Sequence, residues 1–99
     1  MYARATTSVV PPEQQDAAVE QYQNTVPALR EIPGNQGAFL LVDRQSGRGI
    51  AVSLWEDQRA LEDSREEADQ QRQQVANRAG MEIESVDEYE VAIWEPAGG

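Results

Sequence analysis

The centre of the chain has the pattern of a β-hairpin whose two strands are apolar on both faces. The first strand is expected over Gly37–Arg44 and the second over Gly49–Glu56, with a short loop between them that contains Gly47. Glycine in such a loop supplies the positive φ angles that tight turns need. Strands without an alternating polar face are normally covered on both sides. The hairpin therefore predicts the middle of a sheet with two buried faces.

The segments on either side of the hairpin alternate between strand and helix patterns. A Thr- and Val-rich strand is expected over Tyr2–Val10, and a helix over about Pro12–Glu31, where apolar residues recur every three or four positions. A second helix is expected over Asp57–Ala79, with Asp57 as its N-cap and Gly80 as its C-cap, before a last strand over Glu82–Glu95. The order βαββαβ predicts an α+β, ferredoxin-like fold, with a four-stranded antiparallel sheet and both helices on one face.

Two helices on one side leave the other face of the apolar hairpin without a cover. The same face of a second copy is the simplest cover. We therefore expect a homodimer through the open sheet face, which is a dimeric α/β barrel. A chain of 99 residues has room for one domain, expected over residues 1–96 with residues 97–99 as a flexible tail.

The composition excludes several classes of function. The chain has no cysteine and no histidine, and all 8 of its basic residues are arginine. Cysteine nucleophiles, lysine Schiff bases and the usual zinc sites are therefore excluded, and we expect neither a metal nor a cofactor. A net charge of −10 repels phosphate and anionic lipid, so we expect no nucleic acid and no membrane as partners. The first residues lack a signal-peptide pattern, and we expect a cytoplasmic protein.

Several short segments resemble the antibiotic biosynthesis monooxygenase (ABM)-like family of the dimeric α/β-barrel superfamily. The resemblance covers about residues 2–95 and rests on Ile32-Pro33-Gly34, the hairpin strands Gly37–Asp43 and Gly49–Trp55, the segment Trp55-Glu56-Asp57-Gln58-Arg59-Ala60-Leu61 and the closing Val86-Asp87-Glu88-Tyr89-Glu90-Val91. It implies the ferredoxin-like fold and the dimer. It does not by itself imply an activity, because the superfamily includes oxygenases, haem-degrading enzymes and isomerases.

The resemblance places one family site residue directly. In the quinone-forming oxygenases of this family, an active-site tryptophan occupies the position of Trp55. The asparagine and tyrosine that accompany it there fall at Ala51 and Leu61 of this chain. The arginine of the second helix falls at Val75, with two arginines nearby, Arg72 and Arg78.

Four residues are candidates for contact with a small ligand: Trp55, Tyr22, Tyr89 and Arg4. Each also has a structural interpretation. Trp55 ends a central strand and the two tyrosines place a hydroxyl on an apolar face, which suits a core equally well. Arg4 could orient an anionic or phenolic ligand, or it could pair across the sheet with Glu88 or Glu90.

Three functions are compatible with these residues. A cofactor-independent oxygenase acting on a small aromatic compound needs a base, which would be Tyr22, Tyr89 or a carboxylate with a raised pKa. A non-catalytic barrel that binds a small hydrophobic ligand, or that only dimerises, needs no catalytic residue. Haem binding or degradation is the third, although the family tryptophan falls at Ser64 and the chain has no histidine for the iron. Gln70–Gln74 is expected on the helix surface and Trp94 in the dimer interface.

Overall fold

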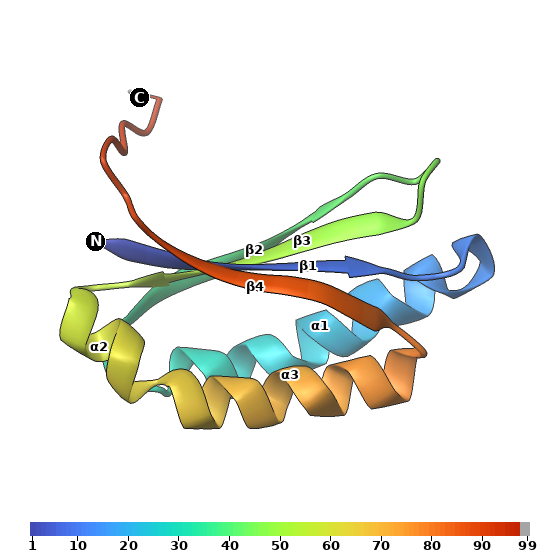
Figure 1. The fold of residues 1–99 in the computed structure, drawn as a ribbon, viewed down its shortest axis with the longest axis horizontal. Coiled ribbons are helices and arrows are strands. Elements are labelled where there is room, and N and C mark those ends of the chain that lie inside the picture. The colour runs from blue at the N-terminus through green and yellow to red at the C-terminus, as the bar shows by residue number, and fades with distance from the viewer. Residues whose placement is uncertain (98–99) are drawn as a thin grey trace.

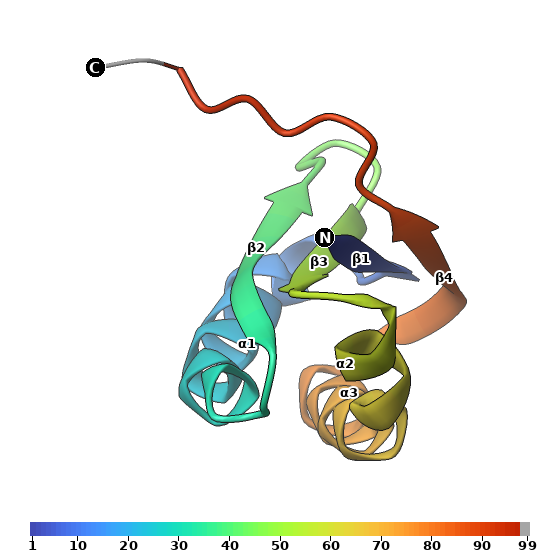
Figure 2. The same cartoon turned by 90° about the vertical axis from the view of Figure 1, so that its left-hand side faces the viewer.

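The computed structural model describes residues 1–97 and confirms the βαββαβ order (Figure 1). Its elements are β1 (Tyr2–Val9), a short 3₁₀ turn (Pro12–Gln14), α1 (Gln15–Arg30), β2 (Asn35–Val42), β3 (Arg48–Trp55), α2 (Gln58–Asp63), α3 (Arg65–Ala79) and β4 (Glu82–Glu90). The strands form one antiparallel sheet in the order β2-β3-β1-β4. Figure 2 shows the helices gathered on one face of this sheet. The fold is α+β and ferredoxin-like.

Both expected caps of the second helical region are present. The Asp57 side chain accepts a hydrogen bond from the backbone N–H of Ala60 at 2.8 Å, which satisfies one of the unpaired donors of the first turn. Gly80 ends the region in the left-handed conformation, with φ 64° and ψ 33°. Local sequence thus determines where this region begins and ends.

The expected single helix over Asp57–Ala79 is wrong, because the region is divided into α2 and α3 at Ser64. In an unbroken helix the Leu61 carbonyl would accept the N–H of Arg65. Here that carbonyl accepts the Ser64 hydroxyl at 2.7 Å and the Arg4 guanidinium at 2.9 Å. A side chain from β1 therefore takes part in breaking the helix.

The last strand ends at Glu90, five residues earlier than the expected Glu95. Its partner β1 begins at Tyr2, which pairs with Glu90, and a final backbone bond joins the Val91 N–H to the Met1 carbonyl. The expected flexible tail over 97–99 falls mainly on residues 98 and 99, which lie outside the described residues.

The inner face of β1, which looks toward the helices, is polar. Arg4, Thr6 and Ser8 are all buried on this face, and the sheet register places them beside Ser53, Ala51 and Gly49 of β3. The alternate residues of β1 point to the open face. The strand thus turns its polar side toward the interior, which is the reverse of the usual arrangement for a half-covered sheet.

Buried apolar residues on the helix side form two small groups, and Ala68, Val75 and Ala76 of α3 are buried outside both. One contains Leu29, Ile32, Trp55 and Leu61, and the other contains Val10, Ala18 and Ala79. Members of both groups line a cavity that lies between them. In the described part of the chain, no helix is both long and apolar enough to cross a membrane.

Candidate functional site

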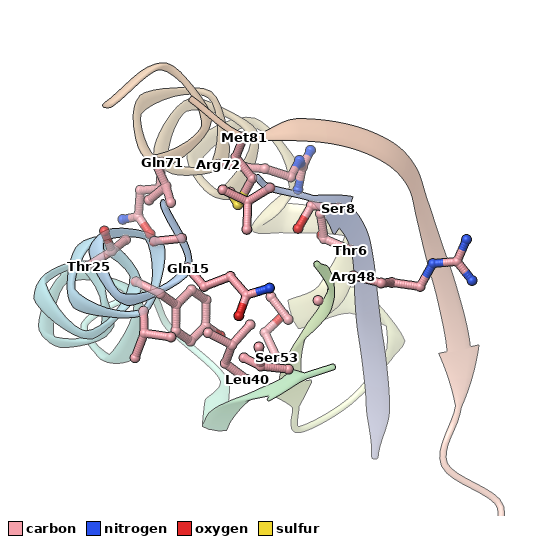
Figure 3. Close-up of a pocket in the computed structure, with 18 of the residues that line it drawn as sticks. Thr6, Ser8, Gln15, Thr25, Leu40, Arg48, Ser53, Gln71, Arg72 and Met81 are labelled. Carbon is pink, nitrogen blue, oxygen red and sulfur yellow. The ribbon is translucent and has the colours of Figure 1, made fainter. Parts of the chain in front are cut away.

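A cavity of about 100 Å³ lies between the inner face of the sheet and the helices α1 and α3 (Figure 3). Most of its wall is apolar and comes from α1, α3 and β2, through Ala18, Val19, Leu29, Leu40, Ala68 and Val75. The sheet adds the hydroxyl groups of Thr6, Ser8 and Ser53. Roughly 10–15 Å³ of such space holds one water molecule, so the cavity has room for several waters or for a small ring compound.

Arg4 is the centre of a buried hydrogen-bond network at one edge of the cavity. Besides the Leu61 carbonyl, its guanidinium donates to the Ser64 hydroxyl at 3.2 Å and to the Glu88 carboxylate at 3.0 Å. Only 4% of the Arg4 side chain is exposed. Burial lowers the pKa of Arg4, and the hydrogen bond and charge of Glu88 act against that shift. A cation at this depth needs such partners, because an unpaired buried charge is strongly unfavourable.

Glu88 joins this network to the protein surface. Its carboxylate accepts from Arg4 and from the Arg65 guanidinium, whose Nε lies 3.1 Å from Oε2. The hydrogen bond from Arg65, together with that from Arg4, holds the pKa of Glu88 below its ordinary value of 4.5. Of the two partners expected for Arg4 across the sheet, the structure selects Glu88, which faces it directly in the β1–β4 register.

Trp55 is fully buried in the Leu29–Leu61 group and lies outside the cavity wall. Its indole Nε1–H donates to the Ser53 hydroxyl at 2.9 Å, and the Arg4 guanidinium carbon lies 5.6 Å from its ring centroid. That distance is within the range of a cation–π interaction. Trp55 therefore contacts two residues of the cavity wall, Arg4 and Ser53, without lining the cavity itself.

The two candidate tyrosines lie on opposite sides of the sheet. Tyr22 of α1 lines the cavity, and its hydroxyl is 3.5 Å from the Phe39 carbonyl oxygen. Burial raises the pKa of Tyr22 to about 12, so its phenol is protonated at neutral pH. Tyr89 of β4 is 57% exposed, and its partner in the register is Ala3, which places it on the open face. The structure thus brings Arg4 and Tyr22 together at the cavity and separates Tyr89 from them.

Sequence reasoning missed the polar residues that α1 and α3 bring to the cavity. Gln15 lies in the wall with only 4% exposure, and Gln71 and Arg72 also line it. The expectation that all of Gln70–Gln74 lies on the helix surface is therefore wrong. A signal was present, because Gln71 and Arg72 lie three and four residues after Ala68 and share its helix face.

Arg72 also marks the boundary between the cavity and the outside. Its guanidinium pairs with Asp69 at 2.7 Å on the same helix. Arg72 and Arg4 line both the cavity and an open groove of about 510 Å³ along α3 and β4. The groove and the cavity thus share these two arginines, and the groove also carries carboxylates, among them Asp69 and Glu88.

Comparison with known proteins places this geometry in a family. The model of the antibiotic biosynthesis monooxygenase family matches residues 1–76. The chain belongs to the antibiotic biosynthesis monooxygenase (ABM) family. A sequence relative is the uncharacterised protein Rv2557 of Mycobacterium tuberculosis, 41% identical over 93 residues. That match covers 93% of this chain but 41% of the relative, so the chain spans about two fifths of the length of the curated relatives it matches.

Solved structures with little sequence identity share the fold. The heme-degrader MhuD of Mycobacterium tuberculosis, with two hemes bound in its active site, is 20% identical and has a TM-score of 0.71 over 97% of this chain and 100% of its own. SnoaB, a cofactor-independent oxygenase from Streptomyces nogalater, is 13% identical and has a TM-score of 0.70 over 96% of each chain. At these identities the likeness concerns the fold.

The residues of this chain do not fit haem. The sequence contains no histidine and no cysteine, and the one phenol in the cavity wall, Tyr22, has a pKa raised by burial, which disfavours an iron-bound phenolate. A cavity of about 100 Å³ is also far smaller than a porphyrin. Among residues 1–97 there is likewise no group of three or more potential metal-ligating side chains.

The carboxylate of Glu88 should stabilise the fold in a pH-dependent way. Glu88→Gln removes the charge that pairs with Arg4, and we expect it to lower the free energy of unfolding at pH 7 by about 1–3 kcal/mol in urea titrations. Because the pKa of Glu88 is depressed in the folded state, this contribution is complete above about pH 4.5 and is lost as the pH falls through the folded-state pKa. The difference between wild type and variant should therefore shrink below that pH.

Glu90→Gln is the matched control, because Glu90 is exposed on the same strand. It should change stability little at any pH. Equal stability of Glu88→Gln and wild type at pH 7, or a difference that does not change with pH, would contradict a structural role for the Arg4–Glu88 pair.

Proposed function

We propose that this ABM-family chain binds a small aromatic or apolar compound in the cavity between the sheet and the helices. The observation that carries the proposal is the cavity itself. Protein interiors are normally filled by side chains, whereas this one keeps about 100 Å³ of largely apolar space. Apolar space with a few converging polar groups is typical of small-molecule sites. Here those groups are Arg4, Arg72, the hydroxyls of the sheet and the amides of Gln15 and Gln71.

Oxygenation of the bound compound is the second candidate function, and the largely apolar wall of the cavity favours it. Such chemistry on a phenolic compound needs a group that takes the phenolic proton and has a pKa near the operating pH. The described residues of the cavity wall include no carboxylate, and Tyr22, with a pKa of about 12, is protonated at neutral pH. These residues therefore favour binding over turnover.

Oxygen consumption separates the two candidates. We expect a single-ring quinol to bind while oxygen uptake at pH 7 stays at the rate of the protein-free blank, because the wall lacks a suitable base. Uptake above the blank that scales with protein concentration would establish the oxygenase instead. An oxygen electrode and a parallel calorimetric titration with the same compound provide both measurements.

Filling the cavity should abolish binding. Ala18 faces the cavity, whereas its neighbour Ala17 on α1 is exposed. We expect Ala18→Leu to weaken binding of a small aromatic probe such as indene at least tenfold in calorimetric titrations, because the added side chain occupies the same space. Ala17→Leu should bind like wild type. Equal affinities in the two variants would place the bound probe somewhere else.

We further propose that the open sheet face pairs with the same face of a second copy. Phe39, Leu41 and Tyr89 lie on this face with 41%, 52% and 57% exposure. The segment after β4, which carries the exposed Ile93 and Trp94, rises on this side of the sheet in Figure 2. Apolar side chains gathered in this way mark a contact surface, and an identical face is complementary in both size and chemistry.

A charge on this face should produce monomers. We expect wild type to have twice the 11.0 kDa mass of the chain in light scattering at micromolar concentration. Leu41→Arg should have the mass of one chain, because pairing would bury an unpaired guanidinium. Gln74→Arg, on the exposed side of α3, should leave the mass unchanged. A wild-type monomer, or a Leu41→Arg dimer, would contradict pairing through this face.

A further inference from the structure

One polar atom in the cavity wall has no partner. Among the described residues, the Gln71 amide oxygen Oε1 is the one buried side-chain nitrogen or oxygen that makes no hydrogen bond within the chain. A buried acceptor of this kind costs about 1–3 kcal/mol of stability when it is left unpaired. Figure 3 shows Gln71 on the helix side of the cavity, together with Thr25 and opposite the sheet residues. The side chain that carries this atom thus lies in the wall of the proposed binding site.

The donors around it on the helix side are already engaged. The Thr25 hydroxyl donates to the Gln21 carbonyl of its own helix at 2.9 Å, and the Gln15 amide donates to the Arg44 carbonyl at 3.3 Å. The Tyr22 hydroxyl is directed at the Phe39 carbonyl. Arg72, the next residue along α3, pairs with Asp69. None of these groups supplies Gln71 with a hydrogen bond, which leaves its amide oxygen available to a donor that enters the cavity.

The charges near the cavity restrict which donor can enter. Arg4, Arg48 and Arg72 all line it, and no carboxylate belongs to its described wall. An ammonium group would meet these cations there without a carboxylate of the wall to pair with, which is unfavourable in a space of low polarity. The donor is therefore a neutral hydroxyl or ring N–H on an otherwise apolar molecule.

We infer that Gln71 determines the specificity of the site, by accepting a hydrogen bond from a neutral N–H or O–H group on a small apolar ring compound. This inference rests on the proposed binding function. It adds that compounds with such a donor are selected over compounds of the same shape without one. A site built to pair with a donor discriminates against the analogue that lacks it, because the buried acceptor is then left unpaired.

Three ring compounds of nearly equal size test the inference. Indole donates through its N–H, benzofuran can only accept through its ring oxygen, and indene does neither. We expect calorimetric titration of wild type to give about tenfold tighter binding of indole than of indene or benzofuran, the effect of one added buried hydrogen bond. In Gln71→Leu the indole preference should disappear, while indene binds as in wild type or more tightly.

Two further variants make the test specific. Gln74→Leu is the matched control, because Gln74 lies on the exposed side of the same helix, and it should keep the full preference for indole. Gln71→Met keeps an unbranched side chain of similar length without the amide. It should lose the preference as Gln71→Leu does, and it provides the comparison if the leucine variant does not fold.

The outcomes distinguish this inference from the proposed function. If indole and indene bind wild type equally, or if the preference survives in Gln71→Leu and Gln71→Met, the site binds apolar rings but Gln71 does not select a donor. If benzofuran binds best, the amide presents its N–H₂ group to the cavity and the inference is wrong. If none of the three compounds binds, the proposed function itself fails.

Discussion

A buried arginine is the constraint on which much of this structure depends. Arg4 lies on the inner face of the second strand from one edge of the sheet, and its guanidinium has to be paired because it is almost wholly removed from water. Its partners come from three places: Glu88 on β4, the Leu61 carbonyl at the end of α2, and Ser64 between the two helices. The Arg4 side chain thus contacts the edge strand β4 and the break between α2 and α3. It also lies over Trp55, and through that ring it contacts the adjacent apolar group.

The polar inner face that begins with Arg4 also explains why the cavity exists. Thr6 and Ser8 follow Arg4 along β1, and opposite them β3 offers Ala51 and Gly49, which are too small to fill the space beneath the helices. Two separate groups of buried apolar residues, one around Trp55 and one around Ala79, therefore lie on the helix side with a gap between them. A gap of this kind deprives its lining of packing contacts. We interpret it as space kept for a ligand, with Gln71 and the arginines as its polar contacts.

The elements that sequence predicted best are those determined by local chemistry. The hairpin, the Asp57 cap and the Gly80 stop are each encoded within a few residues, and the βαββαβ order follows from them. The errors share a different cause. At the break, Ser64 accepts a hydrogen bond from Arg4, 60 positions away, and at the end of β4 Glu90 pairs with Tyr2 of β1, so both features involve contacts between distant parts of the chain. Gln71 was assigned to the surface because glutamines in a polar helix are usually exposed. Its spacing of three residues from the buried Ala68 indicated the same helix face.

We expect the space between sheet and helices to admit a small apolar molecule. A crystal structure of the protein under xenon pressure tests it most directly, because xenon enters apolar protein cavities without needing any specific contact. We expect a strong xenon peak between α1, α3 and the sheet, surrounded by Ala18, Leu40 and Val75. A structure with no xenon there, or with side chains from α1 and α3 collapsed into that volume, would contradict it.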